Sequence, residues 1–199
     1  MLSPLVYCGP MWGGKTEGLI SRLVRAEIQK VRVGAFTPAR NTRDGKKLIR
    51  SHSGASFPAT SVRHADEVVA ASSELDVVGV DEIFMLEGIA DAVREISRLG
   101  KKVVMATLDM DSDGQIWEPV GQVLGMAEEI VKCPAVCSVC KKDAYYTFRR
   151  ADAPNARVLV GAGNYYEPRC RTCWHRGQEE KRRQAGQKEL FRTAPELPS

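Results

Sequence analysis

The segment GPMWGGKT at residues 9–16 constrains the fold of this chain most, because it has the pattern G-x-x-x-x-G-K-[ST]. It follows a short apolar run, Leu5 to Cys8, and precedes a stretch of helical periodicity from about Lys15 to Lys30. Between a strand and a helix, this pattern predicts a loop whose backbone N–H groups converge on phosphate oxygens. A chance glycine-rich turn is the alternative. The predicted ATP- and phosphate-binding residues here are Gly9, Met11, Gly13, Gly14, Lys15 and Thr16.

The rest of the chain continues the alternation of strands and helices. Apolar runs follow at Val31 to Phe36, Asp76 to Val80, Lys102 to Leu108 and Glu129 to Lys132, with a helical pattern from Gly88 to Leu99. Such alternation favours a mostly parallel sheet covered by helices on both faces. We therefore expect an α/β fold like that of P-loop NTPases.

Pattern changes divide the sequence into three parts. Residues 1–132 are predicted to form the nucleotide-binding α/β domain, residues 133–174 a small metal-binding domain, and residues 175–199 a polar tail. Residues 37–57 are rich in Arg, Lys, Ser, Asn and Gly without clear periodicity, which predicts a long loop.

Composition excludes some classes of protein. The chain has 199 residues, enough for one full core and a small appendage. Its formal net charge of +4 suits an anionic ligand without requiring nucleic acid. No apolar run approaches the roughly 20 residues that cross a bilayer, and no signal-peptide pattern opens the chain. We expect a cytoplasmic protein without membrane contact.

An acidic pair, Asp81 and Glu82, ends the apolar run at Val77 to Val80. A carboxylate on a strand neighbouring the phosphate loop is where such proteins hold Mg²⁺, so Asp81 and Thr16 are the predicted magnesium ligands. Glu82, one residue further, is placed to accept a proton from an attacking hydroxyl or water. Solvated carboxylates at a strand end are the alternative.

Four of the six cysteines form two Cys-x-x-Cys pairs, which together can provide four thiolates. Tetrahedral thiolates make a closed, structural Zn²⁺ site, and such a site leaves no open position for catalysis. A redox dithiol, an iron–sulfur cluster or unliganded thiols remain as alternatives. The predicted zinc ligands are Cys137, Cys140, Cys170 and Cys173.

In order and spacing, these motifs resemble the zinc-containing thymidine kinases over Leu5 to Trp174. The resemblance implies that Glu82 is the general base for a nucleoside 5′-hydroxyl, and that Arg43 and Arg149 bind phosphate. In that family a lasso loop covers the base, and it corresponds here to Leu159 to Arg169. The nucleoside-binding residues implied by the resemblance are Met11, Met85, Leu108, Ser112, Thr147, Leu159 and Tyr166.

The sequence departs from the family at base-facing positions. Met85 and Ser112 stand where the family usually has phenylalanines, and Asn41 stands where an aspartate is usual. A thioether and a hydroxyl stack less well on a base, which favours an altered nucleoside preference. Alternatively, Phe84 or Trp117 repacks the pocket.

The resulting hypothesis is a kinase that moves the γ-phosphate of Mg·ATP to the 5′-hydroxyl of thymidine or a related pyrimidine deoxynucleoside. One alternative is a kinase for a different or 5-modified nucleoside. Others are a nucleic-acid-stimulated ATPase with a zinc knuckle, although nucleic acid is not the expected partner, and a nucleotide-binding regulator without transfer activity. The resemblance further implies a homo-oligomer, a tetramer.

Overall fold

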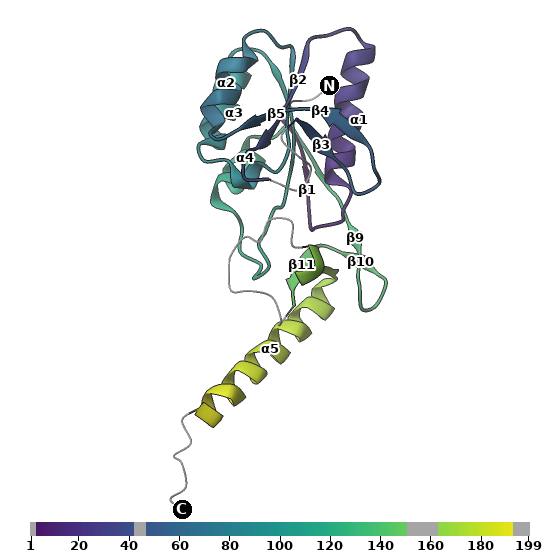
Figure 1. Cartoon of the computed structure of the whole chain (residues 1–199), viewed down its shortest axis with the longest axis vertical. Helices are drawn as coiled ribbons and strands as arrows, with labels where there is room; N and C mark the ends of the chain where they lie inside the picture. Colours follow the sequence, from purple (N-terminus) through teal and green to yellow (C-terminus); the bar gives the residue numbers. More distant parts are fainter. Residues whose placement is uncertain (1–2, 42–46, 151–162, 193–199) are drawn as a thin grey trace, which may run out of the picture.

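A six-stranded parallel sheet organises the molecule (Figure 1). The computed structural model describes residues 3–41, 47–150 and 163–192. The strand order is β5-β2-β6-β7-β1-β8. The strands are β1 (Leu5–Cys8), β2 (Val33–Pro38), β5 (Thr60–Val62), β6 (Val77–Val80), β7 (Lys102–Thr107) and β8 (Glu129–Lys132).

Helices cover both faces of this sheet, as predicted (Figure 1). One face carries α1 (Lys15–Ile28). The other carries α2 (Ala65–Ser72), α3 (Ile89–Arg98) and α4 (Glu118–Met126). The α/β class expected from the alternating pattern is therefore confirmed.

Alternation along the strands separates two hydrophobic cores. Leu5 and Tyr7 of β1 pack with α1, whereas Val6 and Cys8 pack on the face that α2 and α3 cover. Successive side chains of a strand point to opposite faces, so a strand buried on both sides reads as a continuous apolar run. That is why runs of only four apolar residues predicted these strands.

The predicted loop at residues 37–57 is partly wrong, because its second half contains a hairpin. Strand β3 (Leu48–Arg50) pairs antiparallel with β4 (Ser56–Pro58). Ile49 and Phe57 are 1% and 5% exposed and join the core beneath α1. One buried side chain per three-residue strand is too little pattern to detect in sequence.

Below the sheet lies a second unit, which we call the cysteine segment and define as residues 133–150 and 163–174 (Figure 1). It holds two small antiparallel sheets, a 3₁₀ turn, η2 (Gly163–Tyr165), and the start of the last helix. The sheets pair β9 (Ala135–Val136) with β10 (Asp143–Ala144) and β11 (Tyr146–Arg149) with β12 (Tyr166–Arg169).

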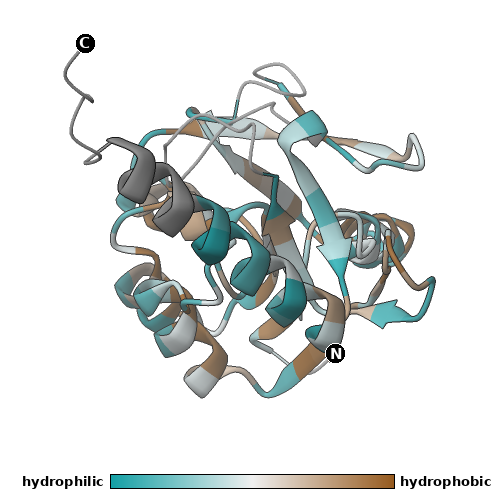
Figure 2. Cartoon of the chain, turned by 90° about the horizontal axis from the view of Figure 1, so that it is seen from below, coloured by the Kyte–Doolittle hydropathy of each residue, from teal (hydrophilic) through white to brown (hydrophobic). Residues whose placement is uncertain are grey.

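The last helix, α5 (Arg171–Arg192), extends away from the sheet. Figure 2 shows that the coloured part of α5 is mostly hydrophilic, in contrast to the brown interior strands. The predicted boundary between residues 174 and 175 falls inside this helix, and the division into domains stays a prediction. Within the described part of the chain, no helix is both long enough and apolar enough to span a membrane.

Candidate active site

The phosphate loop, residues 9–16, connects β1 to α1 and bends through unusual backbone angles. Gly9 and Gly14 have φ values of 138° and 75°, which glycine adopts without steric cost. A Cβ on Gly9 would lie 2.4 Å from the carbonyl oxygen of Cys133. Gly9 is therefore required both by its angle and by the close approach of the cysteine segment.

Lys15 is almost fully buried at the start of α1, and its Nζ donates a 2.6 Å hydrogen bond to the carbonyl of Pro10. Burial lowers the pKa of Lys15, and the carboxylates of Glu82, Asp81 and Asp109 act against that shift. An ammonium group withdrawn from water is stabilised by any anion that reaches it. The loop thus carries a desolvated positive charge where phosphate oxygens would lie.

Thr16 and Asp81 meet, as the sequence predicted. The Thr16 hydroxyl donates to Asp81 Oδ1 at 3.2 Å, and Asp81 is completely buried at the end of β6. The strand carrying Asp81 is not a neighbour of β1, however, because β7 lies between them. That detail of the prediction is wrong, although the two side chains still reach one another. A hydroxyl and a carboxylate are oxygen ligands of the kind that Mg²⁺ prefers.

Glu82 has a left-handed backbone, with φ 50° and ψ 46°, immediately before a 3₁₀ turn, η1 (Ile83–Met85). Residues other than glycine in this region cost on the order of 1–3 kcal/mol and cluster at functional sites. Its Oε2 is buried without a hydrogen-bond partner among the described residues. A buried carboxylate oxygen left open beside Asp81 can accept a proton from a bound molecule.

Asp109 was missed in the sequence, although it lies at the same carboxyl edge of the sheet. It follows β7, is 5% exposed, and its Oδ2 lies 2.9 Å from Lys132 Nζ. Burial opposes the charge on Lys132, but the hydrogen bond to Asp109 and the negative charge of Asp109, with smaller contributions from neighbouring groups, together raise the pKa of Lys132. A carboxylate at a strand end was the signal that identified Asp81, and the same signal could have identified Asp109.

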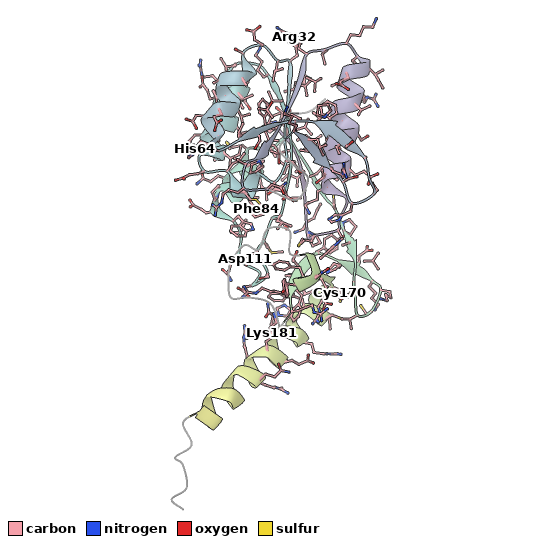
Figure 3. The ribbon with its side chains drawn as sticks, viewed as in Figure 1. Arg32, His64, Phe84, Asp111, Cys170 and Lys181 are labelled. Atoms are coloured by element: carbon pink, nitrogen blue, oxygen red, sulfur yellow. The ribbon has the colours of Figure 1, made fainter. Side chains whose placement is uncertain are left out.

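Several of the predicted nucleoside residues that the structure describes lie around the junction of the sheet and the cysteine segment. Figure 3 shows Phe84 and Asp111 on the side of the sheet nearest Cys170 and Lys181. Met85 lies in η1, and Leu108 directly follows β7; both side chains are half-buried. Ser112 is buried.

Phe84 and Trp117 are the aromatic residues named as an alternative way to fill the nucleoside pocket. Phe84 packs against Trp117, with ring centroids 5.1 Å apart, so both candidates lie together at this edge of the sheet.

The remaining predicted site residues lie in the cysteine segment or outside the described residues. Tyr166 and Arg149 are register partners in the β11–β12 sheet. Arg43 and Leu159 lie outside the described residues.

Trp174 ties this junction together. Its Nε1 lies 3.3 Å from the carbonyl of Ser112 and 3.2 Å from that of Thr147, and the Gln178 side chain donates to the same Ser112 carbonyl at 2.9 Å. The Thr147 hydroxyl accepts a 3.1 Å bond from the Met11 backbone N–H. Thr147 of β11 therefore makes a hydrogen bond to the phosphate loop, and sequence reasoning did not anticipate this contact.

The four predicted metal ligands converge. The Sγ atoms of Cys137, Cys140, Cys170 and Cys173 all lie within 4.8 Å of one another. Backbone N–H groups, from Cys140 first, outweigh burial and lower the pKa of Cys137 to about 6. Four clustered thiols, one of them favouring the thiolate, fit a tetrahedral site that could hold zinc. The cluster supports a structural metal site.

A phosphate loop on a parallel α/β sheet, with a buried carboxylate in contact with its threonine, defines the class of P-loop nucleotide-binding proteins. Comparison with known proteins then fixes the family. The family model described as thymidine kinase matches residues 4–174, and the chain belongs to that family. The resemblance inferred from the motifs is confirmed.

Individual relatives agree. The thymidine kinase of Rhodothermus sp. is 38% identical over 85% of this chain and 79% of its own length. That of Bacteroides thetaiotaomicron is 37% identical over 88% of each chain. Among solved structures, AMPPCP-bound DnaA from Aquifex aeolicus matches 67% of this chain and 41% of its own at 15% identity and a TM-score of 0.43, a likeness too weak to bear on function.

Proposed function

We propose that this protein transfers the γ-phosphoryl group of ATP to the 5′-hydroxyl of thymidine. The observation that carries this proposal is the meeting of the phosphate loop with the acidic pair: Thr16 contacts Asp81, and the open carboxylate oxygen of Glu82 follows directly. Thymidine as the acceptor is supported by the relatives, which are named thymidine kinases.

In this mechanism the phosphate loop binds and orients the triphosphate. Its backbone N–H groups and the buried ammonium of Lys15 bind phosphate oxygens. Thr16 and Asp81 would hold Mg²⁺, which neutralises phosphate charge when bound. Arg149 and Arg43 are the further phosphate contacts that family resemblance assigns.

Glu82 accepts the proton of the 5′-hydroxyl as that oxygen attacks the γ-phosphorus. Its oxygen has no competing hydrogen bond among the described residues, so it can accept this proton. Positioning the two substrates in line contributes much of the remaining acceleration. On the nucleoside side we propose contacts from Met11, Met85, Leu108, Ser112, Thr147, Leu159 and Tyr166.

The remaining assignments follow from the same resemblance and from the cysteines. We propose Zn²⁺ at the four-cysteine cluster and a homotetrameric assembly. Cytoplasmic localisation is proposed because none of the six cysteines forms a disulfide, and unpaired thiols and thiolate metal sites persist in a reducing compartment.

Substitution of Glu82 by Gln tests the mechanism. The amide cannot act as a base, so kcat for thymidine phosphorylation should fall by about 10² to 10⁴, while the Kd for a non-hydrolysable ATP analogue stays within about threefold. Glu87→Gln, which changes an exposed glutamate five residues further along, is the matched control and should retain activity. Full activity in Glu82→Gln would remove the general base from this mechanism.

A kinase for a 5-modified nucleoside is the second candidate, favoured by Met85 and Ser112 at positions that are usually aromatic. Incubation of the wild-type protein with Mg·ATP and a panel of thymidine, deoxyuridine, 5-substituted deoxyuridines and deoxycytidine distinguishes the two. Product identification by mass should give thymidine monophosphate. Transfer only to another member of the panel would replace thymidine as the substrate.

A further inference from the structure

Alternate positions of the phosphate loop contact the cysteine segment, beginning at Cys133, whose backbone N–H also donates to the carbonyl of Cys8 in β1. The carbonyl oxygen of Cys133 approaches the backbone of Gly9 and Gly13 so closely that a Cβ on either would lie within 2.8 Å of it. Thr147 accepts the backbone N–H of Met11. The shape of this loop therefore depends on where the cysteine segment lies.

Trp12 adds a side-chain contact. Its half-buried side chain packs, together with Cys170, against a small core made of Ala135, Cys137, Ala144 and Cys173. Two members of that core and Cys170 itself belong to the four-cysteine cluster. Trp12 thus packs on the small core that contains two of the residues that would hold zinc.

The backbone of Trp12 is strained, which makes this contact informative. Its φ is 64°, in the left-handed region that bulky side chains rarely adopt. Such a conformation persists only where the surroundings hold it. The ring of His52, in the turn of the β3–β4 hairpin, lies 6.0 Å from that of Trp12. Trp12 therefore has neighbours in both the hairpin and the cysteine segment.

We propose that Trp12 is a positioning residue that couples the zinc site to the phosphate loop. With zinc bound, the four cysteines would fix the small core, the core would fix the Trp12 ring, and the ring holds the loop in the strained shape that presents its N–H groups to phosphate. Coupling between two binding sites is reciprocal in binding free energy. Bound nucleotide must therefore raise the affinity for zinc by the same factor by which zinc raises the affinity for nucleotide.

This inference concerns binding alone and does not depend on which nucleoside is phosphorylated. If Trp12 only filled space, nucleotide would protect zinc equally well in any folded variant. If Trp12 couples the sites, then without it zinc and nucleotide should each still bind, but neither should affect the affinity of the other. Nucleotide protection of zinc distinguishes these two roles.

The test measures how zinc distributes at equilibrium between the full chain and a chromogenic chelator, with and without a saturating Mg²⁺ complex of a non-hydrolysable ATP analogue. In the wild type the analogue should raise the apparent affinity for zinc at least about fivefold, the lower end of typical allosteric coupling. In Trp12→Ala the zinc affinities with and without analogue should agree within about twofold, although the analogue still binds. Trp12→Phe, which keeps a ring, should restore most of the protection.

Trp117→Ala is the matched control, because that tryptophan packs on Phe84 and the sheet core, away from the cysteines. It should retain the wild-type protection. Trp12→Leu keeps apolar bulk without a ring and replaces the alanine variant if near-ultraviolet circular dichroism shows that variant unfolded. Equal zinc affinities with and without analogue in the wild type, or full protection in folded Trp12→Ala or Trp12→Leu, would overturn the proposal.

Discussion

The sheet and the cysteine segment are built on different physical principles, although they share one site. The sheet is held by two continuous cores, with many side chains that are completely buried. The hydrophobic cluster around the cysteines has four buried residues, of which two are cysteines. So small a cluster offsets little of the entropy of ordering its chain, so we expect this segment to depend on a metal where the sheet depends on apolar burial.

Removal of one thiolate should have the largest effect on structure, and this effect should be confined to the cysteine segment. Cys173→Ser leaves three thiolates, and structural zinc contributes roughly 10–16 kcal/mol in small peptides. We expect zinc content to fall below one ion per chain and limited proteolysis to cleave within residues 133–174. Circular dichroism should show that the sheet persists.

Cys133→Ser is the control for this experiment, because the thiol of Cys133 lies outside the four-cysteine cluster. Its zinc content should match that of the wild type. A Cys173→Ser protein with full zinc content and unchanged proteolysis would mean that the segment does not depend on this cluster.

A cavity made in the hydrophobic core between α3 and the sheet should have a smaller effect, which is a loss of global stability. Ile96 in α3 is completely buried, and truncation to Ala typically costs about 2–5 kcal/mol through lost burial and a residual cavity. Chemical denaturation should show this loss while zinc content stays unchanged. Ile28→Ala, at a position that is 75% exposed, is the matched control and should change stability little. Equal losses in both variants would contradict the two-core description.

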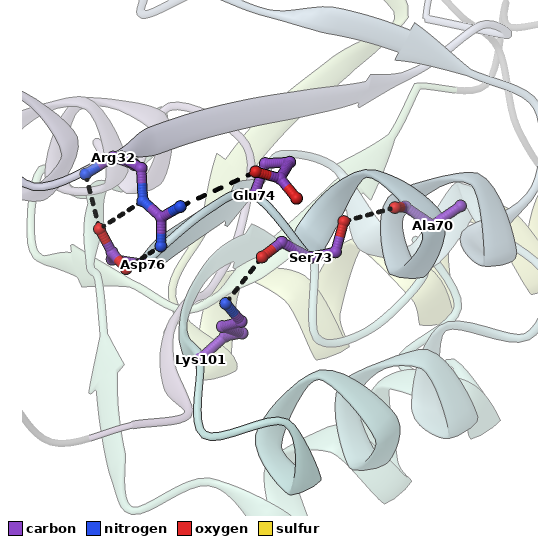
Figure 4. Close-up of polar contacts among 6 residues, drawn as sticks. All are labelled: Arg32, Ala70, Ser73, Glu74, Asp76 and Lys101. Atoms are coloured by element: carbon purple, nitrogen blue, oxygen red, sulfur yellow. Dashed lines mark hydrogen bonds and ion pairs between the residues drawn. The ribbon is translucent and has the colours of Figure 1, made fainter.

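The smallest expected effect lies at the amino ends of the strands, remote from the site. Figure 4 shows Arg32, before β2, paired with Asp76, before β6, by bonds from its backbone N–H, Nε and Nη2 at 2.8–3.1 Å. Lys101 donates to the carbonyl of Ser73 beside them. The hydrogen bonds from Arg32 hold the pKa of Asp76 well below its usual range.

Because the pKa of Asp76 is lower in the folded state, the pair stabilises the fold above the unfolded pKa of about 3.9. That contribution is lost as pH falls towards the folded pKa. Asp76→Asn should therefore lower the melting temperature slightly at neutral pH, and the difference from the wild type should shrink below about pH 4. A difference that grows on acidification would contradict this assignment. Thymidine phosphorylation should be unaffected.

Local patterns were enough to predict the phosphate loop, the strands around it and the four clustered cysteines. Asp81 could be placed near Thr16 because the carboxyl ends of parallel strands meet at one edge of a sheet. The order of strands is not a local property, so the insertion of β7 between β1 and β6 could not be predicted from the runs themselves.

The contacts that set the shape of the phosphate loop were also beyond local pattern. Thr147 reaches Met11 across 136 positions of sequence, and nothing near either residue signals the other. Trp12 reads in sequence as an unremarkable member of a glycine-rich motif. The left-handed backbone of Trp12 and its packing on the core of the cysteine segment become visible only in the folded structure.

The intervening strand β7 has one further consequence. Neighbouring strands lie about 4.8 Å apart, so β1, which leads into the phosphate loop, and β6, which ends directly before Asp81, are separated by about 10 Å of hydrogen-bonded sheet. That span can neither widen nor narrow unless ladders on both sides of β7 break. The sheet therefore fixes the spacing between the strand that leads into the phosphate loop and the strand that ends at the acidic pair.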